Sequence, residues 1–172
     1  MKKFVLISFV LLFILSGCRQ NDLISAPIFI SRFNKISDEK IDDKNICAAE
    51  EEDELVYNFL IKRIYLITLR TEKQSGRIKQ CTVTSQNSKN LEEDDFFELC
   101  GQVVSAYGKI ERKNAEEMLK DYSFKKPEKS SRSGFLRFDF TFNETAAFFS
   151  VESSRLNREK VTDKKLYEQP VN

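Results

Sequence analysis

Apolar and polar side chains alternate most regularly over residues 136–142, where large apolar residues occupy every second position. Arginine, aspartate and threonine occupy the positions between them. A period of two is typical of a β-strand with one face in a core and the other in water. We therefore predict a half-buried strand here, a turn at 143–145 and an antiparallel return strand over 147–152. The residues expected in the core are Leu136, Phe138, Phe140 and Phe142.

The most apolar part of the chain after its first residues is 55–71, and its periodicity is ambiguous. Several apolar residues could share one helical face, but Arg63 falls on that face and β-branched and aromatic residues are plentiful. We interpret the segment as strand. Residues 64–71 then pair with 77–84 across 73–76, a glycine-containing loop of hairpin length.

Shorter apolar runs predict further strands at 28–33 and 46–47. Residues 103–110 are expected to form another strand, interrupted by Gly108. Residues 91–100 mix acids with phenylalanine and leucine, and the pattern fits either a helical turn or a strand edge.

One helix is predicted around residue 114. Asn114 is a suitable N-cap, and Glu116 and Glu117 would lie in the first turn, where negative charge is favoured. Residues 125–133 are rich in serine and basic residues and contain Pro127, which indicates a solvated linker.

Many short strands and one helix predict a mainly β fold, an antiparallel β-sandwich, with α+β as the alternative. We expect a single globular domain over 28–152 and a charged C-terminal tail over 153–172.

The first eighteen residues resemble a bacterial lipoprotein signal. Lys2 and Lys3 precede an apolar run over 4–15, which is too short to cross a bilayer core of about 30 Å. Leu15-Ser16-Gly17-Cys18 resembles the lipobox cut by signal peptidase II. The resemblance implies that residues 1–17 are removed and that Cys18 carries lipid, palmitate included.

The lipobox resemblance also sets the expected location. Residues 18–27 are short and mostly polar, as expected of a tether between a bilayer and a domain. By resemblance to enterobacterial sorting, Arg19 after the anchor favours the outer membrane over the inner one. We therefore expect a lipid-anchored protein of the bacterial envelope that faces the periplasm.

Composition removes several function classes. Histidine is absent, which excludes Ser-His-Asp and Cys-His catalysis and the commonest metal ligand. With 28 basic and 27 acidic residues the chain has almost no net charge, so nothing draws it as a whole to nucleic acid. We predict no catalytic residues, no metal and no cofactor.

Three cysteines remain if Cys18 is lipidated: Cys47, Cys81 and Cys100. In an oxidising compartment we expect one disulfide and one free thiol. The sequence allows three pairings and does not choose among them. Metal binding is disfavoured because no Cys-x-x-Cys pair and no histidine is present.

Two acidic runs are candidates for a patch that attracts a basic protein partner. The alternative is that both runs are solvated loops. Paired carboxylates could also hydrolyse glycosides, but no acid lies in a run that predicts a raised pKa. The runs are Glu50, Glu51, Glu52, Asp53 and Glu54, and then Glu92, Glu93, Asp94 and Asp95 with Glu98.

The tethered chain also resembles the periplasmic immunity lipoproteins of type VI secretion systems. The likeness lies in the anchor, the domain size, Asn45-Ile46-Cys47, the apolar segment 55–61 and a later cysteine, Cys81 or Cys100. It implies an immunoglobulin-like sandwich that neutralises an incoming effector. We therefore expect a non-enzymatic lipoprotein that binds a protein partner; the alternative is a structural or assembly lipoprotein of an envelope machine.

Overall fold

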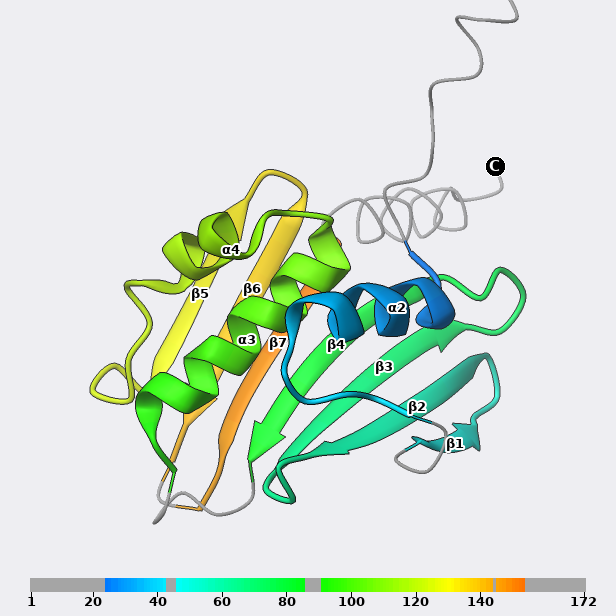
Figure 1. The fold of residues 1–172 in the computed structure, drawn as a ribbon, viewed down its shortest axis with the longest axis horizontal. Helices are drawn as coiled ribbons and strands as arrows, with labels where there is room; N and C mark the ends of the chain where they lie inside the picture. Colours follow the sequence, from blue (N-terminus) through cyan, green and yellow to red (C-terminus); the bar gives the residue numbers. More distant parts are fainter. Residues whose placement is uncertain (1–23, 43–45, 86–90, 144, 154–172) are drawn as a thin grey trace, which may run out of the picture.

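The computed structural model describes residues 24–42, 46–85, 91–143 and 145–153. Seven antiparallel strands form one sheet in the order β1-β2-β3-β4-β7-β6-β5 (Figure 1). The expected signal, Cys18 and nearly all of the expected tail lie outside the described residues. The strands are β1 (Ile46–Glu50), β2 (Glu54–Ile61), β3 (Tyr65–Glu72), β4 (Ile78–Ser85), β5 (Glu128–Ser133), β6 (Leu136–Phe142) and β7 (Ala147–Ser153).

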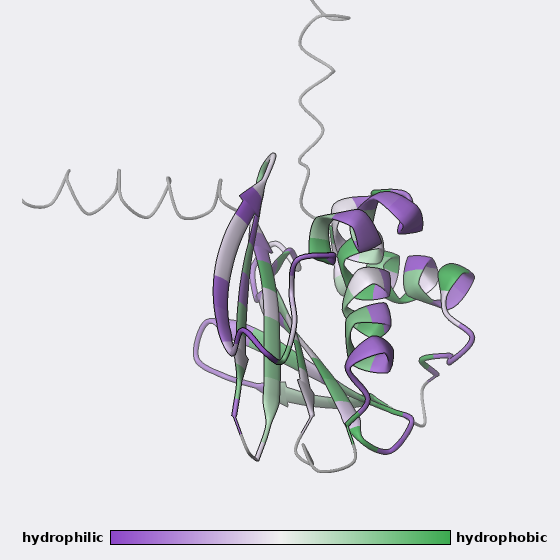
Figure 2. Cartoon of the chain, turned by 90° about the vertical axis from the view of Figure 1, so that its left-hand side faces the viewer, coloured by the Kyte–Doolittle hydropathy of each residue, from purple (hydrophilic) through white to green (hydrophobic). Residues whose placement is uncertain are grey.

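Three helices lie on one face of this sheet, and together they make a two-layer molecule (Figures 1 and 2). They are α2 (Ala26–Ile36), α3 (Glu93–Gly108) and α4 (Arg112–Leu119). The mainly β, antiparallel prediction is confirmed, with three helices among the described residues where one was expected. The described strands do not divide into the two stacked sheets of a sandwich.

The strands predicted from alternation are confirmed. β6 has the burial pattern of a half-buried strand: Leu136, Phe138 and Phe140 point into the core, and the arginine and aspartate between them are partly exposed. β7 returns beside it as predicted. The expected hairpin is β3 and β4, and the expected 46–47 strand is part of β1.

The main errors of the sequence interpretation concern segments that were predicted as strands and are helices. Residues 28–33 belong to α2, in which Phe29 and Phe33 share the buried side one helical turn apart. Residues 91–100 and 103–110 are not two segments, because nearly all of both lies in the single helix α3. From Leu99 to Tyr107 every residue of α3 is buried, so its apolar run carries little periodicity and resembles a buried strand.

Glycines in α3 serve close packing. Gly108 was expected to interrupt a strand but is the last residue of α3. A side chain at this position would come within 2.9 Å of Leu136. The one predicted helix corresponds to α4, but its N-cap is Glu111, three residues before the expected N-cap Asn114, and the helix begins at Arg112.

Two further boundaries differ from the predictions. Residues 128–133, in the expected linker, form the edge strand β5, whose polar sequence suits a sheet edge. Residues 24–27, which the sequence analysis assigned to the tether, are packed on the domain: Ile24 is buried and its carbonyl accepts a hydrogen bond from the Ile78 amide at 2.8 Å.

The position of Ile24 gives the sheet two distinguishable ends. The isolated bridge between Ser25 and Arg77 fixes the start of the domain beside the β3–β4 turn. The β1–β2 turn lies at this same end, since the Lys73 amide donates to the Asp53 carbonyl at 3.1 Å. We call this the near end. The far end carries the β2–β3 turn and lies about 25 Å away, the length of the eight-residue strand β3.

Aromatic side chains join α3 to the sheet. The Phe96 ring of α3 lies 6.2 Å from Phe140 of β6 and 6.2 Å from Tyr65 of β3, between ring centroids. Phe97 adds a contact of 5.2 Å with Phe140, and Phe124 stacks on Phe142 at 4.2 Å. The first turns of α3 are therefore held against strands from both halves of the sheet.

The three cysteines are free thiols, so the expected disulfide is not present in this structure. Cys47 is exposed on β1, three strands from Cys81, about 14 Å across the sheet, and a bridge requires Cα atoms within about 7 Å. Cys81 and Cys100 are both fully buried in one core, between β4 and α3. Of the three pairings open to the sequence, the fold leaves only Cys81 with Cys100.

Neighbouring phenylalanines on β7 provide a test of the two-layer core. Phe149 is 0% exposed and faces the helices, whereas Phe148 is 39% exposed on the uncovered face. Phe149→Ala should lower the free energy of unfolding by about 3–5 kcal/mol, and Phe148→Ala by less than about 1 kcal/mol. Urea denaturation of both variants checks this, and equal losses would contradict the assigned faces.

Thiol labelling tests the placement of the cysteines. With a reductant present, iodoacetamide should modify Cys47 in the folded protein and reach Cys81 and Cys100 only after unfolding. The reason is that both are inaccessible, and burial raises the pKa of each of these two thiols well above its ordinary value. Mass spectrometry counts the modified sites, and Cys47→Ser should remove all labelling of the folded form.

Candidate functional site

The two acidic runs lie at opposite ends of the sheet and do not form one patch. Glu50 to Glu54 surround the β1–β2 turn at the near end, whereas Glu93, Asp94 and Asp95 form the first turn of α3, which begins after β4 at the far end. The structure therefore separates the residues that the sequence grouped as one candidate.

Three of the five acids of the near-end run, Glu50, Glu51 and Glu54, pair with neighbouring cations. Glu54 pairs with Arg70 and Lys79, each at 3.0 Å, and Glu50 pairs with Lys73. Burial opposes the charge on Glu54, but hydrogen bonds from Lys79 and Arg70 outweigh it and hold the pKa of this carboxyl below its ordinary value. This run belongs to an ion-pair network and is a poor candidate for attracting a partner.

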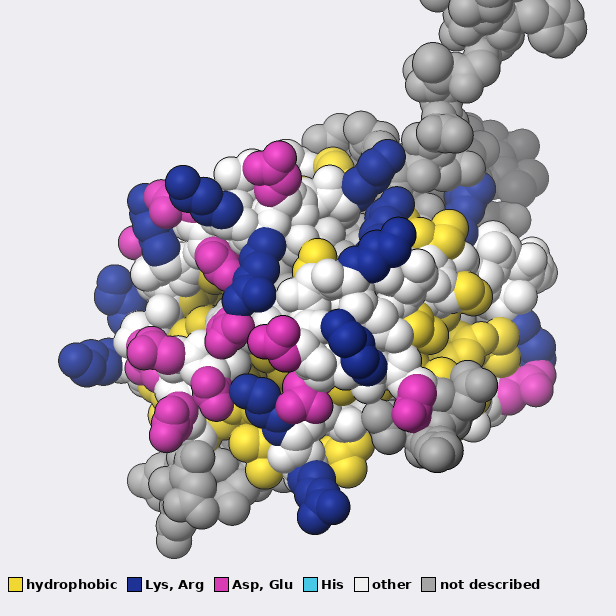
Figure 3. All heavy atoms as spheres, viewed as in Figure 1, with side chains coloured by type: hydrophobic (Ala, Val, Ile, Leu, Met, Phe, Trp, Pro, Cys, Tyr) yellow, Lys and Arg dark blue, Asp and Glu magenta, His cyan; other side chains and the backbone are white. Residues whose placement is uncertain are grey.

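The far-end run has a structural role in α3 and also lines two hollows. Its acids lie in the first turn of α3, where the helix dipole favours negative charge, and the Glu93 carboxylate accepts a hydrogen bond from the Phe124 amide at 3.2 Å. In Figure 3 acidic side chains gather on the lower left of the molecule, with apolar side chains between them, over the start of α3. This run is the first turn of α3, which agrees with one of the two structures that the sequence left open for residues 91–100.

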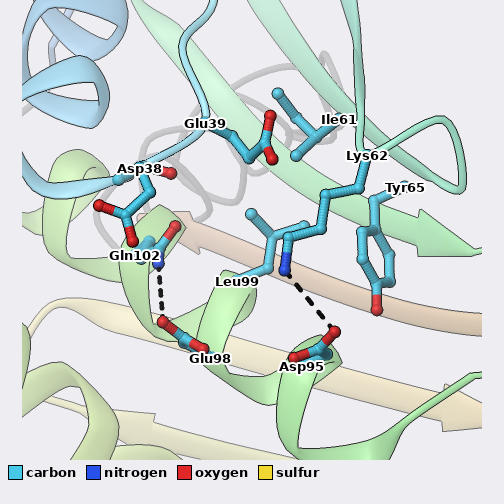
Figure 4. Close-up of a pocket in the computed structure, with 10 residues that line it drawn as sticks. Asp38, Glu39, Ile61, Lys62, Tyr65, Asp95, Glu98, Leu99 and Gln102 are labelled. Carbon is cyan, nitrogen blue, oxygen red and sulfur yellow. Dashed lines mark hydrogen bonds and ion pairs between the residues drawn. The ribbon is translucent and has the colours of Figure 1, made fainter.

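A pocket of about 120 Å³ lies beside this helical turn at the far end (Figure 4). The loop after α2, the end of β2 with its turn, the start of β3 and one side of α3 each supply part of its wall. We call it the far-end pocket. It is lined by Ser37, Asp38, Glu39, Ile61, Lys62, Tyr65, Asp95, Glu98, Leu99 and Gln102.

Acidic side chains outnumber basic ones in this lining. Asp38, Glu39, Asp95 and Glu98 are acidic, and Lys62 is the one basic residue in the lining. The Lys62 ammonium lies 3.6 Å from an Asp95 oxygen, and both side chains are more than 40% exposed. Exposed pairs of this kind contribute about 1 kcal/mol at most, so Lys62 can be displaced from the pocket.

The Tyr65 hydroxyl is the unusual group of the pocket. Tyr65 is 1% exposed, and its hydroxyl has no hydrogen-bond partner among the described residues. Burial, and then the negative charge of Asp95, raise the pKa of Tyr65 to about 12, so the phenol keeps its proton at neutral pH. This hydroxyl is itself buried, so it carries a cost of about 1–3 kcal/mol and offers the pocket no accessible contact.

The β2–β3 turn at the rim of the pocket is strained. Its two central residues, Lys62 and Arg63, have φ values of 49° and 61°, a conformation that favours glycine and asparagine. The Ile64 amide closes the turn on the Ile61 carbonyl at 3.2 Å. Strain of about 1–3 kcal/mol per residue persists where function requires a particular side chain.

Apolar side chains flank this strained turn. Leu60 is 51% exposed and Ile64 is 43% exposed, so the hairpin presents two aliphatic side chains beside two cations. We call Leu60, Lys62, Arg63 and Ile64 the hairpin tip. Lys62 belongs both to the hairpin tip and to the lining of the far-end pocket.

A second, more open hollow of about 330 Å³ lies between α3 and α4. Glu98, whose carboxylate pairs with Arg112 at 2.6 Å, borders both hollows. This second hollow is lined by Glu93, Asp94, Phe97, Glu98, Glu116, Leu119, Lys120 and Tyr122.

Sequence reasoning missed Tyr65 and the hairpin tip. Both lie in the 55–71 segment, which was interpreted as strand without locating its turn, because the turn contains neither glycine nor asparagine. The positive charges of Lys62 and Arg63 inside an apolar run were the available signal. The part of the pocket wall from Ser37 to Glu39 could not be linked to the hairpin tip, since only the tertiary fold brings these segments together.

The described residues hold no group of three or more potential metal-ligating side chains that could bind a metal ion. None of the described helices is long and apolar enough to cross a membrane.

Backbone strain at the hairpin tip can be tested against a second residue with positive φ. Lys109 has φ 55° at the C-terminus of α3. Arg63→Gly and Lys109→Gly should each raise the free energy of unfolding by about 0.5–1 kcal/mol, because glycine relieves the strain. Urea denaturation measures both; a loss of stability in Arg63→Gly would show that the turn is not strained.

Comparison with known proteins yields no relative: no protein-family model, no curated protein and no solved structure matches the chain.

Proposed function

We propose that this protein is a lipid-anchored envelope protein, without enzymatic activity, that binds another protein through the hairpin tip and the far-end pocket. The single observation that carries the proposal is the hairpin tip, where Leu60 is 51% and Ile64 is 43% exposed beside the cations Lys62 and Arg63. Its surroundings support the proposal. Lys62 of this strained turn also lines the far-end pocket, and exposed aliphatic side chains beside such a hollow suit a protein interface.

The expected anchor at Cys18 supports an orientation in which the far end of the sheet points away from the bilayer. Cys18, the proposed lipid site, lies six residues before Ile24, and six residues span at most about 20 Å. Ile24 is fixed at the near end of the sheet. A chain held by Cys18 would therefore keep the near end toward the bilayer and present the far end, with its pocket, to the periplasm.

The chemistry of the pocket fits binding better than catalysis. The chain has no histidine, and the phenol of Tyr65, with a pKa of about 12, is a poor acid or base at neutral pH. Immunity to a secreted effector remains our first proposal for the biological role. This proposal rests on the resemblance to a lipobox and on the Asn45-Ile46-Cys47 segment. It does not depend on an immunoglobulin-like sandwich.

Site-specific photocrosslinking tests the proposed surface. p-Benzoylphenylalanine replaces Ile64 at the hairpin tip in one variant and Gln74 in the near-end turn in the other. In native cells that produce the full-length chain, Ile64 should crosslink to a distinct protein and Gln74 should not. Equal crosslinking at both positions, or none at Ile64, would contradict the proposed surface.

The identity of the crosslinked protein then separates the two biological roles. A secreted toxin supports immunity, and a component of an envelope machine replaces immunity by the assembly role. Cys18→Ala tests the anchor independently: the variant should leave the membrane fraction, and unchanged fractionation would contradict lipid attachment.

A further inference from the structure

We propose that the free edge of β1 binds an extended segment of another protein, which joins the sheet as an antiparallel strand and carries basic residues at its N-terminal end. The proposal goes beyond the function proposed above, because the hairpin tip takes no part in it. Three features of the molecule carry it: the open edge, the lack of any device on β1 that blocks pairing, and the unpaired acids beside it.

β1 is the outermost described strand on its side of the sheet (Figure 1). It pairs with β2 in an unbroken antiparallel register, from Ile46 opposite Phe59 to Glu50 opposite Leu55. In such a ladder the amide and carbonyl groups of alternate residues point to opposite sides of the strand. Those of β1 that point away from β2 meet no other described strand, and all four residues after Ile46 are exposed. This edge therefore offers a row of backbone donors and acceptors to a further strand.

β1 also lacks the devices that natural edge strands use against pairing. Such devices include lysine, proline and β-bulges, and Ile46–Glu50 contains none of them. The other edge of the sheet differs, because β5 carries Glu128, Lys129 and Arg132 and directly follows Pro127. The central residues of β1 are a cysteine and two alanines, whose small side chains leave room for a strand at the usual spacing of about 4.8 Å.

The turn after β1 sets the charge expected of the added strand. The side chains of Glu52 and Asp53 are exposed and form no ion pair or hydrogen bond with any described residue. Since β1 runs toward the near end, an antiparallel strand beside it begins at the near end. Basic residues at its N-terminal end would then lie next to these two carboxylates. The acidic run is too far paired to attract a partner from a distance, but its two free acids act at short range on a strand that the edge holds.

A second copy of this chain fits the edge less well than another protein does. Antiparallel pairing of β1 with itself across a two-fold axis places the near end of one copy beside the far end of the other. Two chains anchored through Cys18 in one bilayer would instead share the same orientation. The anchor proposed above therefore opposes pairing between copies.

The test measures how three fluorescein-labelled heptapeptides bind the full-length chain in detergent micelles, by fluorescence anisotropy. The first, Arg-Lys-Thr-Val-Thr-Val-Thr, has its basic pair at the N-terminus. The second, Thr-Val-Thr-Val-Thr-Lys-Arg, has the pair at the C-terminus, and the third, Glu-Glu-Thr-Val-Thr-Val-Thr, reverses the charge. The first should bind with a dissociation constant of about 10–100 μM, the second about threefold more weakly and the third about tenfold more weakly. High salt should narrow these differences.

Two proline variants separate the free side of β1 from its paired side. Ala48 and Ala49 are neighbours, so the amide of one points to β2 and the amide of the other points outward. Proline at the inward position should lower the melting temperature. Proline at the outward position should change it little and weaken the first peptide about tenfold, because it removes a donor from the free edge alone.

A charge variant tests the orientation without altering the strand. Glu52→Gln combined with Asp53→Asn should abolish the difference between the first and third peptides. The matched control is Asp38→Asn combined with Glu39→Gln, an adjacent acidic pair at the far end, which should preserve that difference.

Equal affinity for the three peptides, or no effect of either proline variant on the first peptide, overturns the proposed strand site. A dimer in light scattering that the outward proline dissociates would show that a second copy occupies the edge, and it would overturn the assignment to another protein. Crosslinking at Ile64 does not involve β1, so a failure of this proposal is distinguishable from a failure of the function proposed above.

Discussion

The packing of α3 against the inner face of the sheet is the contact on which the rest of this structure depends. Phe96 and Phe97 fit among aromatic side chains of β3, β6 and the segment after α4, and Cys100, Val103 and Val104 continue the contact along β4. Large aromatic side chains bury about 150–250 Å² each, so these few residues supply a large part of the hydrophobic stabilisation. The same contact fixes the position of Asp95 beside Tyr65. The site is therefore a direct product of the core.

The sheet was largely predictable from the sequence, and the reason is local. In β3 and β6 one face meets the helices and the other meets water, so residues alternate in polarity and the period of two is visible. In α3 the middle of the helix is buried on all sides between the sheet, α2 and α4, so no polar stripe reveals a period of 3.6. Phe29, Phe33 and Pro27 did carry a helical signal in α2, but the run is short and apolar enough to resemble a strand.

The candidate site was beyond sequence reasoning because its parts come from three distant segments. Charge runs directed attention to Glu50 and its neighbours, which the fold places in an ion-pair network at the near end. In the sequence, Tyr65 cannot be told from any other tyrosine of an apolar strand. Its missing hydrogen bond is a property of the packed structure alone.

The bridge between Ser25 and Arg77 determines how the domain would respond to a pull on its N-terminus. Mechanical load would pass first through this short bridge and then into α2, which is joined to the rest of the helix layer by contacts such as Arg32 to the Ala106 carbonyl at 3.5 Å. Phe29 and Phe33 of α2 are fully buried in the core, so the load passes along the helix to the segment that follows it. Since the segment after α2 supplies Ser37, Asp38 and Glu39, tension at one end of the molecule would deform a wall at the other.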